Sequence, residues 1–311
     1  MQSTLGTSVV FDGVGLHSGA PVRMTVHPAP ANYGIVFFRT DLPEAEQRLP
    51  AKWDQVVPSK LCTLLSNASG ATLSTVEHIM AALTGCGVHN ARIEVTGPEV
   101  PILDGSSAPF VREFLRVGLI ASQVPVRVLK ILKAVEVRDG EAVARLEPAD
   151  SMEMNFEIDF ADAAIGHQEK QLNLTNGTFV RELSDSRTFC RQADVDFMQT
   201  HGLALGGTLE NAVVVDGDRV LSPGGLRYRD EPVRHKMLDA LGDLALAGGP
   251  IQGRYTGIRA GHAMTNRLLR QLFATPGAWI WTEVTARSGR KLPGAGVTMA
   301  DLPTGSELMP A

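Results

Sequence analysis

The sequence has few cysteines and no long apolar run. Cys62, Cys86 and Cys190 are scattered, and no two stand in a Cys-x-x-Cys spacing. This set excludes a disulfide framework, none of the three looks like a metal ligand, and reduced thiols in a cytoplasmic protein are indicated. No stretch reaches the roughly 18 uninterrupted apolar residues of a membrane helix. The first residues lack the basic and apolar regions of a signal peptide, so we expect neither a leader nor a membrane segment.

An excess of positive charge is also absent. The net charge is −5 at pH 7 and the isoelectric point is near 5.9, which argues against a nucleic-acid partner. What is present is a 44% hydrophobic composition over 311 residues, enough to bury a real core. This length predicts two domains rather than one.

The clearest joint in the chain lies around residues 121–125, between a helix-like stretch and a new alternating run. We therefore predict an N-terminal domain over residues 1–122 and a C-terminal domain over residues 126–311. The two halves echo each other, since residues 78–85 align with 235–242 and each segment precedes a strand-like run. Strand patterns at 22–26, 35–38, 154–160 and 212–215 mix with helices without regular alternation, which predicts an α+β fold.

A histidine and a glutamate stand together in the predicted helix after residue 74. The helix has an apolar stripe, and its other side carries alanine and glycine instead of charged residues, so we expect it to be buried. Ser74 and Glu77 have the spacing of a capping box, in which Glu77 would only close the helix start. A buried His78 beside Glu77 needs polar partners or a metal. A helix cap, a hydrogen-bonded core histidine and a metal site all remain open.

His235 and Asp239 are four apart in a second predicted helix, so both point off one face. An exposed pair at this spacing would contribute little. However, Asp239 and Asp243 are also four apart, and like charges there repel unless a cation compensates them. With His78, the chain offers two imidazoles and one carboxylate, the ligand set of an open catalytic zinc site, with Glu77 beside it as a general base. A metal-dependent hydrolase is the leading prediction.

Two further histidines have a possible chemical role. His262 lies just before a helix with an apolar stripe, and it is either an unremarkable residue near a helix start or a second acid–base group tuned by a carboxylate such as Asp243. His17, within the Gly-rich segment 13–19, can approach a ligand, although a plain turn is the preferred interpretation.

Six motifs together resemble the UDP-3-O-acyl-N-acetylglucosamine deacetylase family, zinc amidases that commit precursors to lipid A synthesis in Gram-negative bacteria. They follow the family order from about residue 3 to about residue 285 and comprise residues 13–19, 74–78, 101–110, 186–189, 233–244 and 261–263. The resemblance implies two similar α+β domains. Each would pack a five-stranded sheet on helices, and the two helical layers would face each other around the active site.

The resemblance also implies roles for individual residues. One Zn²⁺ per chain, or Fe²⁺ in the cell, would be bound by His78, His235 and Asp239. Glu77 resembles the general base, His262 the charged acid that meets the leaving amine, Asp243 its orienting partner, and Thr188 a hydroxyl that helps to hold the oxyanion. Lys236 and Phe189 resemble substrate contacts, and Phe160 resembles a residue that stacks on uracil. An insert in the second domain would form an apolar passage for the acyl chain, lined by Val195, Ala204, Leu209, Ala212 and Val214.

The partner implied is therefore a UDP-linked acyl amino sugar, and we expect a monomer that binds no nucleic acid. Two other classes stay open. Two histidines and one carboxylate also describe a non-haem Fe(II) oxygenase, although that chemistry does not call for an adjacent glutamate base. A binding module that kept the fold and lost the chemistry is the other alternative. Against it, every position that the family uses for catalysis carries the expected residue type.

Overall fold

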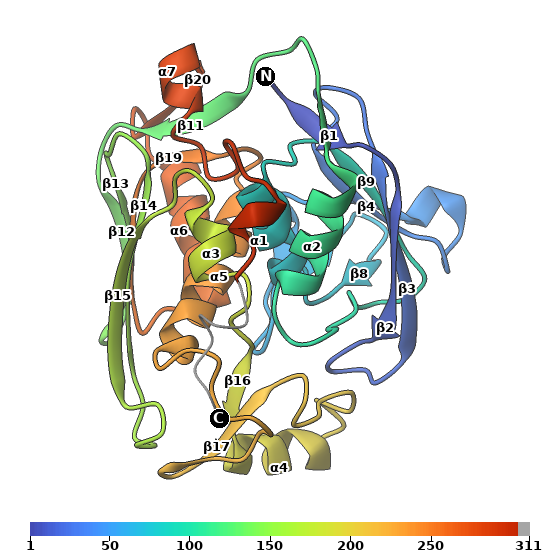
Figure 1. Cartoon of the computed structure of the whole chain (residues 1–311), viewed down its shortest axis with the longest axis vertical. Coiled ribbons are helices and arrows are strands. Elements are labelled where there is room, and N and C mark those ends of the chain that lie inside the picture. Colours follow the sequence, from blue (N-terminus) through green and yellow to red (C-terminus); the bar gives the residue numbers. More distant parts are fainter. Residues whose placement is uncertain (304–311) are drawn as a thin grey trace.

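The structure is a computed structural model that describes residues 1–303. Residues 304–311, the end of the predicted C-terminal domain, lie outside the described residues. Two large sheets form the outer layers, and helices from both halves of the chain lie between them (Figure 1). This arrangement confirms the α+β fold class. Among the described helices, none combines the length and the apolar content needed to cross a membrane.

The sheet of the N-terminal half has five strands in the order β2-β3-β9-β4-β5. Its pairings are antiparallel except for β4 with β9, which run parallel. Helices α1 and α2 flank β9 in the sequence, and a small sheet of β6, β7 and β8 precedes α1. The bounds are β2 Val9–Val14, β3 Pro21–Pro28, β4 Ile35–Arg39, β5 Arg48–Pro50, β6 Val56–Val57, β7 Leu64–Ser66, β8 Thr72–Leu73, α1 Glu77–Cys86, β9 Ala91–Val95 and α2 Ala108–Val117.

The C-terminal half repeats this pairing as β12-β13-β19-β14-β15. Among these five strands the one parallel pair, β14 with β19, corresponds to β4 with β9. Helices α5 and α6 flank β19 in the sequence as α1 and α2 flank β9. The echo between the two halves of the sequence thus corresponds to a repeated topology. The bounds are β12 Val135–Asp139, β13 Ala142–Glu147, β14 Met152–Asp159, β15 His167–Asn173, α5 Glu231–Ala245, β19 Ile251–Ile258 and α6 His262–Ala274.

The second sheet has seven strands, two more than the five expected. The additional strands are β11 (Arg127–Ile131) and β20 (Trp279–Glu283). They join because β19 is eight residues long, so that its first residues pair with β11 while the rest pair with β14. The first half keeps its equivalent pair, β1 (Ser3–Leu5) with β10 (Leu119–Ala121), as a separate two-stranded sheet. The first repeat thus ends with β10 and the second begins with β11. The domain limits 1–122 and 126–311 themselves stay predictions.

The segment between β15 and α5 is much longer than its counterpart in the first half. It holds a short three-stranded sheet and a helix that project from the two main layers (Figure 1). Its elements are α3 Thr178–Glu182, β16 Phe189–Arg191, α4 Gln192–Thr200, β17 Val213–Asp216 and β18 Arg219–Val220. We call residues 189–220 the insert. The predicted strand at 212–215 is β17, and the residues before it, 201–212, form turns.

Burial explains why α1 carries alanine and glycine, and no charged residues, opposite its apolar stripe. In α1, all residues from Glu77 to Leu83 are buried, and in α5 most residues from Glu231 to Leu244 are buried. Helix α1 ends where Gly87 takes a left-handed conformation (φ 78°), the usual helix stop for a glycine. Polar side chains on these two helices therefore face a protein interior and not solvent.

Candidate active site

Helices α1 and α5 pack directly against each other at the centre of the molecule. Gly242 makes this approach possible, because a Cβ atom at that position would overlap the backbone carbonyl of Glu77. The contact brings the start of α1 beside the middle of α5. Residues more than 150 positions apart in the sequence thereby face one another.

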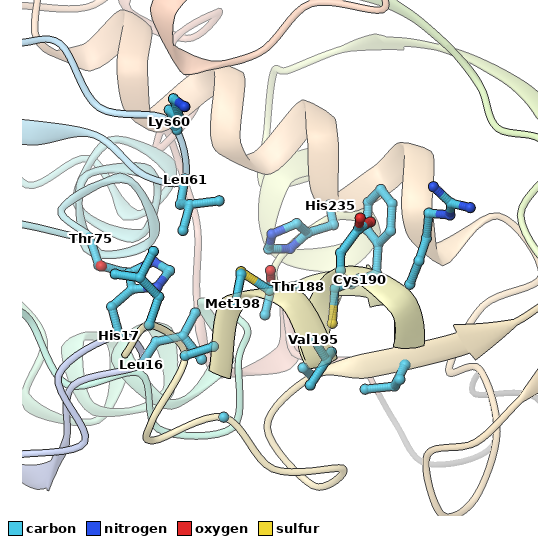
Figure 2. Close-up of a pocket in the computed structure, with 18 of the residues that line it drawn as sticks. Leu16, His17, Lys60, Leu61, Thr75, Thr188, Cys190, Val195, Met198 and His235 are labelled. Carbon is cyan, nitrogen blue, oxygen red and sulfur yellow. The ribbon is translucent and has the colours of Figure 1, made fainter. Parts of the chain in front are cut away.

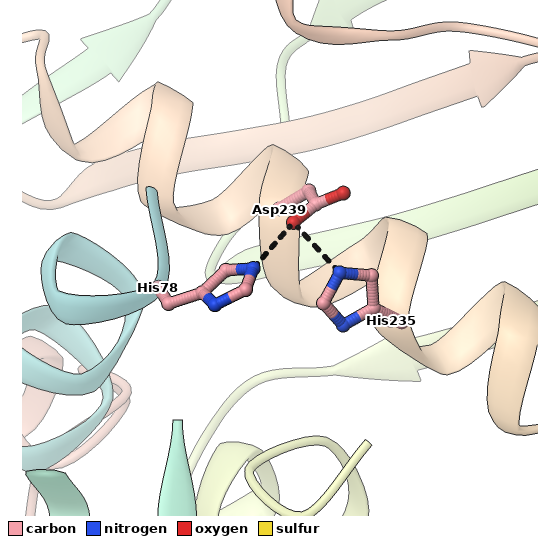
Figure 3. A group of neighbouring side chains, drawn as sticks. All are labelled: His78, His235 and Asp239. Carbon is pink, nitrogen blue, oxygen red and sulfur yellow. Dashed lines mark ion pairs between the residues drawn. The ribbon is translucent and has the colours of Figure 1, made fainter. Parts of the chain in front are cut away.

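His78, His235 and Asp239 converge at this contact (Figure 3). The Nε2 atoms of His235 and His78 lie 3.2 and 3.5 Å from Asp239 Oδ1, and one potential ligand atom from each residue lies within 4.8 Å of the others. All three residues are at most 5% exposed. Among the described residues, this is the one group of His, Cys, Asp or Glu side chains with such geometry.

The donor set fits a divalent transition metal. Asp239 Oδ1 is buried and has no hydrogen-bond partner, a costly state that a cation would relieve. Its second oxygen accepts a hydrogen bond from Lys236 Nζ at 2.9 Å. His235 Nδ1 lies 3.0 Å from the carbonyl of Ser186, which holds Nε2 toward the other ligands, as backbone carbonyls do for histidines that bind zinc. Two imidazoles and one carboxylate with room for a water match an open zinc site.

Glu77 is the first residue of α1, and its carboxylate faces the same centre. The capping box with Ser74 does not form: the helix begins later than that motif requires, and the Ser74 hydroxyl donates to the Pro98 carbonyl. Instead, Glu77 Oε2 accepts the backbone N–H of Thr63 at 3.1 Å. Burial, with a smaller contribution from Asp239, raises the pKa of Glu77 to about 7.

His262 lies across from Glu77 at the start of α6. Its Nδ1 is 2.9 Å from Asp243 Oδ2, and its Nε2 is 3.7 Å from Glu77 Oε1 and 3.8 Å from Asp239 Oδ2. Burial opposes the charged form of His262, but Asp243 and the other carboxylates outweigh it and raise the pKa of His262 to about 9. The position can therefore supply a protonated imidazole at neutral pH.

Thr63 is a part of this centre that the sequence did not reveal. Besides its N–H bond to Glu77, its hydroxyl donates a short hydrogen bond to Asp243 Oδ1, so that one residue links the two carboxylates. Thr63 is 3% exposed. A single threonine in an irregular segment has no periodicity or spacing, so the sequence held no signal for it.

A cavity of about 810 Å³ opens from this centre toward the insert (Figure 2). Its walls include Glu77, the three potential metal ligands and His262. The structure places around it every residue expected to contact substrate: Lys236, Phe189, Phe160, Val195, Ala204, Leu209, Ala212 and Val214. Thr188 lines it too, with its backbone held by Gly105 and Val213. The Phe160 and Phe189 rings meet edge to face at 5.5 Å.

The comparisons with known proteins agree with this geometry. Residues 2–274 match the family model described as UDP-3-O-acyl N-acetylglycosamine deacetylase. A UDP-3-O-acyl-N-acetylglucosamine deacetylase of Phenylobacterium zucineum (strain HLK1) is 49% identical over 278 residues, which cover 89% of this chain and 95% of that protein. One of Shewanella sp. (strain W3-18-1) is 46% identical over 280 residues, covering 89% and 91%. The chain belongs to this deacetylase family.

Other residues also line the cavity, among them His17, for which a plain turn was the preferred interpretation. Leu16 and His17, from the turn after β2, line the cavity, as do Leu61 and Met198 (Figure 2). The turn expected around His17 is present, yet it also faces the cavity. Residues 13–19 form one of the motifs that resemble the family, and this resemblance was the signal in the sequence for a role of this turn at the site. Met198 and Leu61 lie in segments without a motif.

Proposed function

We propose that this chain hydrolyses the N-acetyl amide of UDP-3-O-acyl-N-acetylglucosamine, releasing acetate and the free amine in the committed step of lipid A synthesis, and that it does so with Zn²⁺. One observation carries the proposal: the unpartnered Asp239 Oδ1 faces two buried histidines beside Glu77, at the inner end of an apolar cavity. The names of the relatives supply the substrate class. We place the enzyme in the cytoplasm as a monomer.

The proposed metal would be held by His78, His235 and Asp239. When bound, Zn²⁺ polarises the amide carbonyl and lowers the pKa of water toward about 7. Glu77 would take a proton from the attacking water, and its raised pKa makes it a stronger base than an exposed carboxylate. The hydroxyl of Thr188 would donate to the carbonyl oxygen as negative charge develops there.

The leaving amine needs a proton as the C–N bond breaks, and His262 would provide it. Its imidazolium would be stabilised by Asp243, which accepts a hydrogen bond from Nδ1–H and leaves Nε2–H directed at the centre. Lys236 and Phe189 would contact the substrate, and Phe160 would stack on the uracil. The acyl chain would lie along Val195, Ala204, Leu209, Ala212 and Val214.

The test is acetate release from UDP-3-O-acyl-N-acetylglucosamine by the purified protein. We expect turnover that a chelator such as dipicolinate abolishes and that added Zn²⁺ restores. Loading the apoprotein with Fe²⁺ under anaerobic conditions shows whether iron serves equally. Full activity after verified metal removal would overturn the metal part of the proposal, and no acetate from the loaded protein would overturn the reaction.

The two alternatives make different predictions in the same assay. A non-haem Fe(II) oxygenase would consume O₂ with substrate, and a binding homologue would bind the sugar nucleotide without releasing acetate. The carboxylate–imidazole pair of Glu77 and His262, 3.7 Å apart, favours hydrolysis, which needs one group to accept a proton and another to donate one.

A further inference from the structure

A carboxylate outside the metal centre holds one wall of the cavity together. Glu99, which lies between β9 and α2, is 2% exposed. Its Oε1 accepts hydrogen bonds from the His17 N–H at 2.9 Å and the Thr75 hydroxyl at 3.0 Å. Its Oε2 accepts from the Ser18 N–H at 2.9 Å and the Ser18 hydroxyl at 2.7 Å. Among the side chains that the structure describes, no Lys, Arg or His forms an ion pair with it.

These four donors come from two segments that line the cavity. Leu16 and His17 belong to the turn at residues 15–19, and Thr75 lies two residues before Glu77. Close contact between turn and carboxylate depends on Gly15, because a Cβ atom there would overlap Glu99 Oε2. Glu99 therefore binds the turn through two backbone N–H groups, those of His17 and Ser18, and through the Ser18 hydroxyl.

The turn at residues 15–19 is hydrogen-bonded to the insert. The carbonyls of Leu16 and His17 accept hydrogen bonds from the N–H groups of Gly206 at 3.0 Å and Leu205 at 3.2 Å. Gly206 is required at this contact, since a Cβ atom there would overlap the Gly15 carbonyl. Segment 204–209, which these hydrogen bonds hold in place, contributes Ala204, Gly207, Thr208 and Leu209 to the cavity lining.

Glu99 also holds an unusual backbone. Thr75 has φ 59°, a left-handed conformation that a β-branched residue rarely adopts. Such a conformation persists only where the surroundings fix it. The Thr75–Glu99 hydrogen bond, together with the bridge between Ser74 and Glu99, provides that constraint immediately before the Glu77-His78 pair.

We propose that Glu99 is a positioning residue for the acyl-chain cavity, because it ties the turn at residues 15–19, and through it the insert, to the segment between β8 and α1. The proposal rests on the proposed deacetylase function. A carboxylate suits four donors, because it is an acceptor at both oxygens. Glutamine at this site would direct an NH₂ group at one pair of donors and so release either the His17–Thr75 side or the Ser18 side.

The first test measures acyl selectivity in Glu99→Gln. We expect kcat/KM for the 3-O-dodecanoyl substrate to fall about tenfold, largely through KM, while the 3-O-butanoyl analogue changes less than about twofold. Asn90→Asp is the matched control, since Asn90 is also 2% exposed and joins separate segments through Gln2 and Gly34, away from the cavity. It should lower the melting temperature without altering the ratio of the two substrates.

A double-mutant cycle separates positioning from general destabilisation. Gly206→Ala should change acyl selectivity in the same direction, because it displaces the insert from the same turn. Since both changes break one chain of contacts, the selectivity of the double variant should be close to that of the worse single variant and not the product of both effects. Fully multiplicative effects, or equal losses on both substrates, would overturn the proposal.

Hydrogen exchange provides a measurement that does not depend on catalysis. In Glu99→Gln, the amides of residues 17, 18, 205 and 206 should exchange at least about tenfold faster than in the wild-type protein, whereas those of α6 should not change. If these amides keep wild-type rates, Glu99 does not position the wall. If they exchange faster but the wild-type protein releases no acetate, the proposed function fails while the structural link stands.

Discussion

At the scale of single residues, the three potential metal ligands differ from ordinary buried polar groups. Replacing His235 or Asp239 with alanine should remove Zn²⁺ and activity together, because each change leaves only two ligands in a buried site. Metal content by mass spectrometry and acetate release are the measurements. Asp162→Asn, at an ion pair with Arg191 away from these ligands, is the control and should keep its zinc. Full zinc content in both ligand variants would refute the assignment.

Glu77 allows a test of base against structural roles. Glu77→Gln should keep Zn²⁺ but lose at least about 10²-fold in kcat, the usual scale for a general base. A residue with only a helix-capping role would instead cost on the order of 1 kcal/mol of stability and leave turnover of the folded protein nearly intact. Melting temperature and kcat are measured on the same preparation, so a stability loss with unchanged kcat would exclude the base.

Sequence reasoning works at this scale where chemistry and spacing coincide. His235 and Asp239 share a helix face, and their pairing follows from helical periodicity. Thr63 shows the opposite case, since its contacts to Glu77 and Asp243 arise from an irregular segment that only the tertiary fold brings to the site. Glu99 was missed for the same reason: a lone acidic residue in a loop resembles a solvated one.

At the scale of elements, the contact between α1 and α5 sets the geometry of the centre. Gly242→Ala should separate the helices, because the added Cβ meets the Glu77 carbonyl, and it should cost roughly 1–3 kcal/mol of stability and weaken Zn²⁺ affinity. Gly85→Ala is the control: its Cβ meets the ring of Phe179 and not α5. We expect both variants to be destabilised to a similar extent, but only Gly242→Ala to bind Zn²⁺ more weakly. Equal zinc affinity in both variants would contradict it.

A histidine near β1 makes the stability of the first half depend on pH. The Nδ1 atom of His89 accepts the backbone N–H of Ser3 at 3.1 Å, and burial lowers the pKa of His89 from 6.5 to about 4. The unfolded chain binds this proton more readily, so the stability that His89 contributes is present above pH 6.5 and is lost as pH falls toward 4.

His89→Gln should therefore flatten the pH dependence of unfolding. Glutamine can still accept the Ser3 N–H but does not titrate. The loss of stability between pH 6.5 and 4 should be smaller in the variant by roughly 3 kcal/mol. Urea unfolding across this range is the measurement, and parallel curves for the two proteins would show that His89 does not contribute.

The whole molecule combines a repeated scaffold with unequal additions. The echo of residues 78–85 in 235–242 predicted the duplication, because each copy places a ligand helix before a central strand, β9 or β19. The seven-stranded sheet was not predicted, since β11 joins only through the extra length of β19. The shape of the insert also escaped sequence reasoning, because residues 201–212 follow neither helical nor strand periodicity.

The cavity is built from both halves of the chain and from the insert. Ala212 lies at its wall and is 6% exposed, so a larger side chain there should fill space that a long acyl chain would use. Because each buried methylene contributes roughly 0.8 kcal/mol, Ala212→Phe should raise KM for the 3-O-dodecanoyl substrate at least about tenfold and spare the 3-O-butanoyl analogue. Val220→Phe, on β18 and outside the cavity lining, is the control. If Ala212→Phe treats long and short chains alike, this segment is only core and the acyl chain lies elsewhere.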